Sequence, residues 1–343
     1  MGNYLIIGAG LAGISLAERF LEHNHTIKVV DKVDDPSSTQ VATGMANPIV
    51  FKRLNKSWLI DVLVPEAHAF YSKLETKLNA KLLEPIDLRK RITSKDYASF
   101  WNKRAKEEEY EAYLSPIKCQ CGPVKQAFSV DCKSLQSAYL RSLESSNMLI
   151  NTDFDHSHID VAKGNIVFQD QVFDAVIFCE GAYAVYNPLW NWLPFKVAKG
   201  DWVEIELEKE IADFVLNNVV NVIPLGNKRY KLSSSFEWDT MDWGPSPSAR
   251  EELLNSFSEL FNIPYKVVDQ RSGLRPAASD RRPFLGEHPR KPGHYIFNGF
   301  GSKGVLLAPY FSQHLYDHIT MQSDLMKEVN VKRHLKRFQA QNQ

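Results

Sequence analysis

A short glycine-rich turn between a strand and a helix is the feature that most constrains how this sequence folds. Asn3–Ile7 is an apolar run of strand type, and Leu11–Leu21 carries apolar residues at helical spacing. Between them, Gly8, Gly10 and Gly13 form the pattern Gly-x-Gly-x-x-Gly. The first glycine permits a tight turn, the second lets a pyrophosphate approach the backbone, and the third lets helix and strand pack closely. Because the helix start also presents unpaired N–H groups to phosphates, we expect a dinucleotide-binding turn.

An acidic residue follows at the distance that such a turn requires. Thr26–Val30 predicts a second strand, and Asp31 stands directly after it, about 20 residues beyond the turn, where a carboxylate meets ribose hydroxyls. An acid at this place disfavours a 2′-phosphate and therefore NADP. Asp31 and its neighbour Lys32 are accordingly candidate cofactor-binding residues. The turn alone does not separate FAD from NAD, and the alternative interpretation is a glycine-rich turn without a ligand.

Length and charge narrow the classes of protein that this chain can form. A chain of 343 residues suits two interlocked domains. Lys plus Arg and Asp plus Glu number 41 each, so no global field draws the chain onto DNA or an anionic membrane. We expect a cytoplasmic protein without stable membrane insertion, because no segment has the length and apolarity of a membrane span or the pattern of a signal peptide. The four cysteines lack the spacing of a zinc site, so we expect no metal.

The order of the remaining elements predicts an α/β fold. A last strand, His294–Asn298, leads through Gly299–Gly304 into a helix that reaches about Met321, and we expect this unit in the same sheet as the first strand. The aromatic-rich middle then forms an inserted domain with a mixed or antiparallel β-sheet. The predicted Rossmann-like domain is discontinuous and takes residues 1–83, 124–195 and 267–343, and the predicted substrate-binding domain takes residues 84–123 and 196–266.

Hydrophobic patterns predict further elements between these units. Helices are expected over Trp58–Leu78, 94–114, Cys132–Ser145 and Ser248–Phe261. Strands are expected over Val124–Val130, Asn165–Phe168, Val172–Phe178, Lys199–Leu207, Val219–Pro224 and Arg229–Ser235. Residues 36–58 are expected to be irregular, and the aromatic run 186–195 favours core packing over a membrane-dipping surface.

Four segments carry a resemblance to a known family. Ser38–Pro48 is a loop of small residues after the second strand, and Phe173–Ala182 is a buried strand that ends in a small-residue turn. Arg271–Pro276 contains Gly-Leu-Arg-Pro, and Gly299–Pro309 is a glycine-rich turn that opens a helix. Together they resemble the D-amino-acid oxidase superfamily of FAD-dependent oxidoreductases. Within it the chain is most similar to glycine oxidase and to the FAD domain of the bifunctional enzyme that modifies the tRNA wobble uridine.

The resemblance implies that the first domain is glutathione-reductase-like and holds FAD. It adds these cofactor-binding candidates: Thr43, Gly44, Met45, Gly181, Gly301, Ser302, Lys303 and Gly304. For Lys303, a solvated position on the protein surface is an equal alternative interpretation. Glu180 departs from the family's Ala-Gly pattern, and an acid near a pyrophosphate must point away or be paired. Some relatives attach flavin covalently through a cysteine near the C-terminal turn; because no cysteine follows Cys179, we expect non-covalent FAD.

The same resemblance implies the chemistry. In glycine oxidase-like enzymes the arginine of the Gly-x-Arg-Pro segment holds the substrate carboxylate, which by position is Arg275, and a guanidinium fork suits that contact. Tyr230 is implied to line the substrate pocket. The expected reaction is hydride transfer from the carbon beside an amine to flavin N5, on a small amine or amino acid, with oxygen as one candidate electron acceptor. A structural ion pair is the alternative interpretation of Arg275.

Two other functions stay open at this point. The turn Gly299–Gly304 favours the tRNA-modifying relative, and the basic C-terminus around Lys332–Arg337 is a candidate RNA contact. The zero net charge argues against tRNA as a partner, and the apolar spacing of Val331, Leu335 and Phe338 favours an amphipathic terminal helix instead. A third interpretation is a non-catalytic dinucleotide-binding protein.

Overall fold

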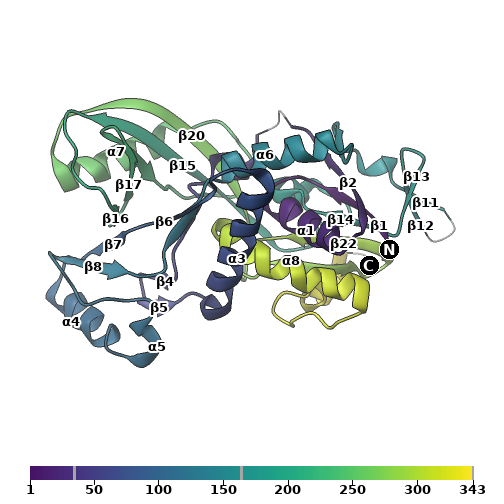
Figure 1. The fold of residues 1–343 in the computed structure, drawn as a ribbon, viewed down its shortest axis with the longest axis horizontal. Coiled ribbons are helices and arrows are strands. Elements are labelled where there is room, and N and C mark those ends of the chain that lie inside the picture. Colours follow the sequence, from purple (N-terminus) through teal and green to yellow (C-terminus); the bar gives the residue numbers. More distant parts are fainter. Residues whose placement is uncertain (34–35, 163–164, 342–343) are drawn as a thin grey trace.

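The glycine-turn unit at the N-terminus forms the centre of a six-stranded sheet. The computed structural model describes residues 1–33, 36–162 and 165–341. In it β1 (Asn3–Ile7), α1 (Leu11–Glu22) and β2 (Thr26–Asp31) follow the predicted ranges closely. The sheet has the order β10-β2-β1-β14-β22-β21 (Figure 1). Its other strands are β10 (Leu149–Asn151), β14 (Ala175–Phe178), β21 (Phe284–His288) and β22 (Lys291–Asn298).

Both faces of this sheet are buried. Tyr4 and Ile6 of β1 belong to one hydrophobic cluster, whereas the alternate residues Leu5 and Ile7 belong to another. Every strand pairing from β10 to β22 is parallel, and only β21 is antiparallel to its neighbour. Since β1 and β22 lie in one sheet, the prediction that the first and last strand–turn–helix units share a sheet is confirmed.

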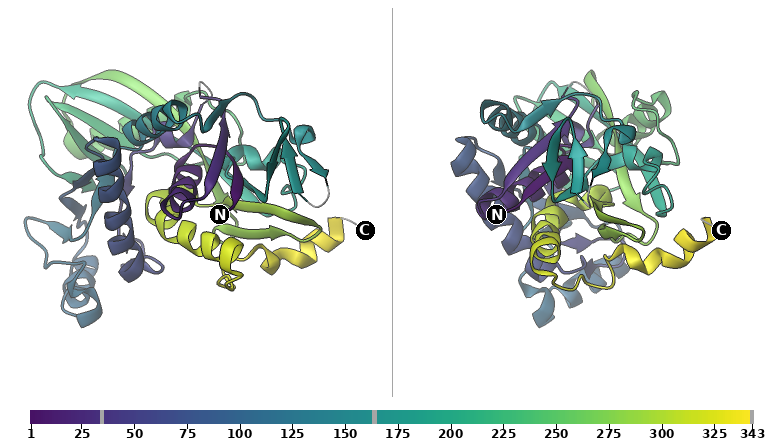
Figure 2. Two further views of the ribbon diagram at one scale, coloured as in Figure 1. Left: turned by 45° about the vertical axis from the view of Figure 1, so that its right-hand side comes forward. Right: turned by 90° about the vertical axis from the view of Figure 1, so that its right-hand side faces the viewer.

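Helices from both ends of the chain pack together against one face of the sheet. α8 (Gly304–Met321) lies beside α1 and α3 (Ile60–Leu78), as Figures 1 and 2 show. Arg19 of α1 donates hydrogen bonds to the α8 carbonyl oxygen of Pro309 (3.1 Å), and the Tyr71 hydroxyl of α3 donates to the carbonyl oxygen of Val305 (3.0 Å). α6 (Cys132–Ser145) spans the predicted residues. The hairpin strands are β11 (Asp160–Ala162), β12 (Asn165–Phe168) and β13 (Gln171–Phe173).

A second sheet of eight strands forms the other lobe of the molecule (Figure 1). Its longest pair is β15 (Phe195–Leu207) and β20 (Tyr265–Ala278), which run antiparallel over their whole length. The other strands are β7 (Leu88–Arg91), β8 (Cys121–Val124), β16 (Val215–Asn217), β17 (Asn221–Gly226), β18 (Arg229–Ser233) and β19 (Glu237–Trp238). α7 (Pro247–Phe261) covers one face through Leu253 and Phe257.

Three predicted elements are each divided in the structure. The predicted strand Val172–Phe178 is split between β13 and β14, which lie in different sheets. The predicted helix over 94–114 is α4 (Lys95–Arg104) followed by α5 (Glu108–Glu111). The backbone is extended at Glu107, and the turn lets Trp101 and Tyr110 both reach the core. The predicted strand Val124–Val130 ends at Val124 and resumes as β9 (Phe128–Val130) in another sheet, because Gln126 has a left-handed backbone with φ 57°.

Several short elements and one long one lie where no regular structure is predicted. Residues 36–58 contain α2 (Ser38–Val41), β3 (Met45–Ala46), β4 (Ile49–Val50) and β5 (Asn55–Lys56). The long strand β20 is also absent from the predicted elements. Trp190 and Trp192 are buried, so the packing interpretation of 186–195 is confirmed. Within the three ranges that the structure describes, no helix combines the length and apolarity needed to cross a bilayer.

Candidate cofactor and substrate site

The two glycine-rich turns, one from each end of the chain, line a single cavity of about 1140 Å³. Gly8 and Gly10 of the first turn and Gly301 and Gly304 of the second turn all contribute to its wall. The turns also lie close together, since an idealised Cβ on Gly304 would lie 3.4 Å from Leu11 Cδ1. The arrangement that a dinucleotide lying between the two helix starts requires is therefore present.

Each glycine of the first turn is needed for a different reason. Gly8 has a φ of 101°, and an added Cβ would lie 2.6 Å from the Cys179 carbonyl oxygen. Gly13 does not line the cavity; an added Cβ there would lie 1.8 Å from the Gly8 carbonyl oxygen, so its role is close packing. Gly10 offers no side chain to cap α1, and the Thr39 hydroxyl accepts a hydrogen bond from the first N–H of the helix, that of Leu11.

Asp31 and Lys32 lie on the same wall. The backbone N–H of Ala9 donates a hydrogen bond to the Asp31 carboxylate, so the acid braces the turn from the end of β2. The Lys32 ammonium lies 2.9 Å from an oxygen of Asp153, and both side chains are largely exposed. Both predicted residues thus stand beside the glycine turn.

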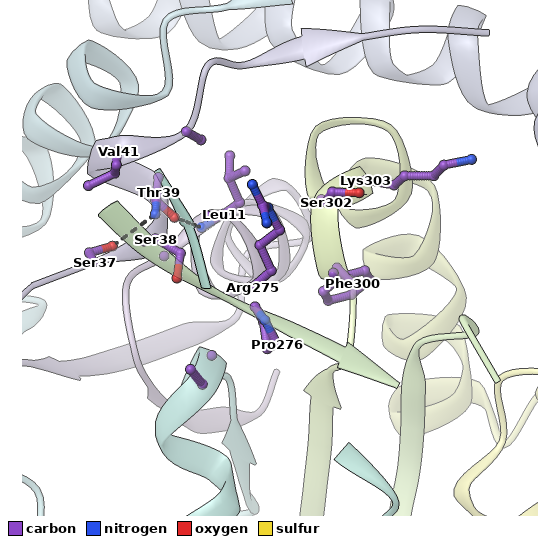
Figure 3. Close-up of a pocket in the computed structure, with 18 of the residues that line it drawn as sticks. Leu11, Ser37, Ser38, Thr39, Val41, Arg275, Pro276, Phe300, Ser302 and Lys303 are labelled. Carbon is purple, nitrogen blue, oxygen red and sulfur yellow. Dashed lines mark hydrogen bonds between the residues drawn. The ribbon is translucent and has the colours of Figure 1, made fainter. Parts of the chain in front are cut away.

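The segment after β2 is fixed to the turn and supplies the next part of the wall. Thr39 Oγ1 accepts a hydrogen bond from the Leu11 N–H at 3.1 Å, and Ser37 caps α2 (Figure 3). Thr43, Gly44 and Met45 also line the cavity. Gly44 has a φ of 68°, and an added Cβ would lie 1.8 Å from the Val130 carbonyl oxygen.

Gly181 lines the cavity after β14, and the preceding acid is paired. The Glu180 carboxylate lies 2.9 Å from His156 Nε2 and accepts a hydrogen bond from Asn187 Nδ2 at 2.7 Å. Only 9% of its side chain is exposed. The prediction that this acid must point away or be paired is therefore confirmed.

The second turn places Lys303 at the cavity instead of in bulk solvent. Gly301, Ser302, Lys303 and Gly304 all line the wall. The half-buried Lys303 ammonium donates a hydrogen bond to Ser57 Oγ at 3.1 Å. Burial and then the nearby charges of Arg282 and Arg281 lower the pKa of this ammonium. These contacts do not support the alternative of a solvated surface lysine.

Arg275 projects from β20 between the segment Ser37–Val41 and the turn that carries Ser302 and Lys303 (Figure 3). Its Nη1 donates to the carbonyl oxygens of Ser235 (3.2 Å) and Lys199 (3.3 Å). Burial lowers the pKa of this guanidinium to about 10. No carboxylate of the described ranges forms an ion pair with it, in contrast to the alternative interpretation of a structural ion pair.

Tyr230 is a correction to the sequence-based prediction, because it does not line the cavity. It is 2% exposed and packs in the cluster under α7. Its hydroxyl donates to the Ala212 carbonyl oxygen (3.0 Å) and accepts from the Ile211 N–H (3.0 Å). Side chains alternate along a strand, and the next residue, Lys231, lies on the opposite face with its ammonium 4.3 Å from the ring centroid of Trp202.

Three residues that sequence reasoning missed also line the cavity near Arg275. Trp202 donates its indole N–H to the Val41 carbonyl oxygen at 2.9 Å and so joins β15 to the cofactor loop. The ring centroid of Phe236 lies 4.3 Å from Arg275 Cζ. Gly200 lies directly under the Arg275 guanidinium. A glycine inside an expected strand signals close approach of another group, and Gly200 carries that signal.

Comparison with known proteins assigns the chain to a family. The family described as FAD dependent oxidoreductase (DAO) matches residues 3–318, so the chain belongs to it, and FAD is its cofactor. The chain is 29% identical over 144 residues to glycine oxidase of Pseudomonas aeruginosa, and this match covers 40% of this chain and 39% of that protein. It is 21% identical over 352 residues to the tRNA 5-methylaminomethyl-2-thiouridine biosynthesis bifunctional protein MnmC of Marinobacter nauticus. This match covers 93% of this chain and 55% of that protein.

The fold matches solved structures over nearly the whole chain. Iminodiacetate oxidase from Chelativorans sp. BNC1 superposes with a TM-score of 0.74 at 20% identity, and the match covers 96% of this chain and 98% of that one. The likeness shows an α/β fold with several β-sheets. The family establishes an oxidoreductase, so the interpretation as a non-catalytic protein is wrong.

The residues of the cavity fit the cofactor of this family. The start of α1 lies on the cavity wall at Gly8 and Gly10, where it suits a pyrophosphate. Gly8 and Gly44 let the turn and the loop pack closely on the carbonyl oxygens of Cys179 and Val130. The start of the 18-residue helix α8 stands on the same cavity, where its dipole favours negative charge. Both helix starts thus offer positive potential to one elongated anionic ligand.

Proposed function

We propose that this protein oxidises the C–N bond of a small amine that bears a carboxylate, such as an amino acid or an N-substituted glycine. Bound FAD supplies the chemistry, by accepting a hydride at flavin N5. The names of two similar proteins, glycine oxidase and iminodiacetate oxidase, denote substrates of this kind. Loss of the hydride and of a proton from nitrogen gives an imine, which water hydrolyses to a carbonyl compound and ammonia, or an amine where the substrate nitrogen is substituted.

This proposal rests mainly on the surroundings of the Arg275 guanidinium. A half-buried guanidinium without a carboxylate partner in the described ranges is unfavourable unless an anion joins it. Arg275 lines the cavity; its Nη1 donates to two carbonyl oxygens, and Nε and Nη2 have no acceptor among the described residues. A substrate carboxylate at this place would be held bidentately, and the carbon beside the amine would be oriented toward the flavin.

We assign the cofactor contacts to the residues that line the cavity. The α1 start at Gly8 and Gly10 takes the pyrophosphate, and Asp31 and Lys32 take the adenosine half. The loop with Thr43, Gly44 and Met45, the turn at Gly181 and the second turn at Gly301, Ser302, Lys303 and Gly304 take the flavin half. The contacts are non-covalent. The start of α8 would stabilise negative charge on a flavin held there.

The two large sheets support a division of the chain into two domains. We propose that residues 1–83, 124–195 and 267–343 form a Rossmann-like, glutathione-reductase-like FAD-binding domain, and that 84–123 and 196–266 form the substrate-binding domain. The six-stranded sheet draws all its strands from the first set, and the eight-stranded sheet draws seven strands from the second set and β20 mainly from the first. The two sets therefore interlock at the strand that carries Arg275.

A tRNA substrate is the alternative, and it has less support. The relative MnmC aligns along most of this chain. Against it, the apolar residues Val331 and Phe338 of the basic C-terminal segment are buried, and Arg333 pairs with Asp280 at 2.9 Å. The segment therefore has a packing role. Filter binding of tRNA across a salt series tests this alternative, since phosphate contacts give a steep loss of affinity with salt.

Anaerobic reduction of the purified holoenzyme tests the main proposal. We expect the visible flavin bands to bleach with glycine, sarcosine or iminodiacetate, and not with glycinamide, which keeps the amine but lacks the carboxylate. Readmission of oxygen then shows whether oxygen accepts the electrons. Protein that releases no flavin on denaturation, or that is bleached equally by glycine and glycinamide, would refute the proposal.

A further inference from the structure

The position of Gly200 is determined by the guanidinium of Arg275. The two residues lie on the paired strands β15 and β20, where Arg275 stands opposite Ala198 and leans along the sheet toward Gly200. An idealised Cβ on Gly200 would lie 1.8 Å from Nη2, 2.1 Å from Cζ and 2.3 Å from Nη1. All three atoms are similarly close, so the flat face of the guanidinium rests directly on the Gly200 backbone.

Space, and not backbone conformation, requires glycine here. Gly200 is absent from the glycines with positive φ, so its backbone is one that alanine adopts without strain. Its neighbours in the pairing stay close to regular, because the register between Gly200 and Gly273 is unbroken. The three atoms nearest to an added methyl all belong to the end of the Arg275 side chain.

Other contacts complete the placement of the guanidinium. The Phe236 ring lies 4.3 Å from Cζ, and Nη1 is held by the carbonyl oxygens of Ser235 and Lys199. For Nε and Nη2, residues 1–33, 36–162 and 165–341 supply no hydrogen-bond acceptor. One edge of the guanidinium is thus engaged by the protein, and the Nε–Nη2 edge is left for a ligand.

We propose that Gly200 is a positioning residue that presents the Nε–Nη2 edge of Arg275 side-on to the substrate carboxylate and so sets the preference for carboxylate over neutral ligands. The inference rests on the proposed role of Arg275 in carboxylate binding. A bidentate contact needs its partners within a fraction of an ångström and about 10–20° of the productive geometry. A methyl at position 200 displaces the guanidinium on the order of 1 Å, which breaks that alignment.

A double-mutant cycle with a ligand that is not oxidised tests this inference. Acetate and acetamide are titrated into the holoenzyme of four proteins: wild type, Gly200→Ala, Arg275→Ala and the double variant. Binding is followed by the shift of the visible flavin spectrum, and flavin content and melting temperature check the fold. We expect Gly200→Ala to weaken acetate binding roughly tenfold to a hundredfold, as for loss of a hydrogen-bonded charge contact, and to leave acetamide binding unchanged.

The cycle separates the two proposals. In the Arg275→Ala background the clash is gone, so Gly200→Ala should change acetate affinity less than about twofold, within the additivity of independent sites. Wild-type acetate affinity in Gly200→Ala, or an equal loss in both backgrounds, overturns the role of Gly200 while that of Arg275 stands. If Arg275→Ala binds acetate as tightly as wild type does, the carboxylate role of Arg275 fails, and the inference fails with it.

Discussion

Replacing Gly44 by alanine separates two costs in the loop that we assign to the flavin. The residue has a φ of 68°, and left-handed backbone costs a non-glycine residue about 1–2 kcal/mol. The added Cβ would also lie 1.8 Å from the carbonyl oxygen of Val130, which belongs to the backbone of β9 and cannot rotate away. Overpacking of this kind costs about 1–3 kcal/mol, so the free energy of unfolding should fall by about 2–5 kcal/mol.

Gly181 is a matched control for this substitution. It lines the same cavity with a φ of 56°, but no protein atom lies within 4 Å of its idealised Cβ. Gly181→Ala should therefore lower the free energy of unfolding only by the backbone cost of about 1–2 kcal/mol. Urea unfolding of the FAD-free variants measures both values. If the two losses agree within about 0.5 kcal/mol, the contact with Val130 does not cost what the structure indicates.

Three further outcomes are expected. Addition of FAD at a hundred times its Kd should raise the free energy of unfolding by about 2.7 kcal/mol, and independence from FAD concentration would contradict specific binding. Burial lowers the pKa of His288 to about 4. Between pH 6.5 and 4 the imidazole is therefore protonated in the unfolded chain but neutral in the folded protein. Stability should therefore fall over that range by up to about 3 kcal/mol, and urea unfolding of His288→Asn should show a shallower loss. Tyr230→Phe should lower stability by about 1 kcal/mol through loss of the hydrogen bond to Ala212, with no change in KM; a raised KM would return Tyr230 to the substrate site.

Elements with strong local signals were predictable from the sequence. β1, α1 and β2 carry the period of their own secondary structure, and α6 has an Asp131 cap that fixes its start. The strand β20 was not predictable in this way, because its residues alternate irregularly between exposed and buried positions. It is a strand through its pairing with β15, more than 50 residues earlier, and such pairing outweighs local propensity.

The residues of the site likewise differ in how well the sequence predicts them. The glycine turns and the cofactor loop are short motifs whose backbone requirements appear in the sequence, and their residues meet at one cavity. The surroundings of Arg275 arise from Lys199, Gly200 and Phe236, which reach it only through strand pairing and the loop after β18. Tyr230 shows the remaining difficulty, since a shift of one residue along β18 exchanges the face under α7 for the face toward Trp202.

Two arginines in this protein show how a structural cation differs from a functional one. Arg19 of α1 is 9% exposed, and its guanidinium contacts Glu22 at 3.3 Å, Glu66 and the Pro309 carbonyl oxygen, so its charge is compensated within the fold. Arg275 is half-buried, and within the described ranges its hydrogen-bond partners are carbonyl oxygens, with the Phe236 ring 4.3 Å from Cζ. Breaking this set by Arg19→Met should destabilise the protein by about 1.5–3 kcal/mol, since Glu66 and the Pro309 carbonyl oxygen lose a charged hydrogen-bond donor, whereas Glu22 keeps Lys73. Arg275→Met removes a charge that the protein without substrate does not compensate. The free energy of unfolding should therefore not fall in this variant, whereas carboxylate binding is lost. A large loss of stability in Arg275→Met would mean that the fold itself depends on this cation, and the strongest reason for placing the substrate beside it would disappear.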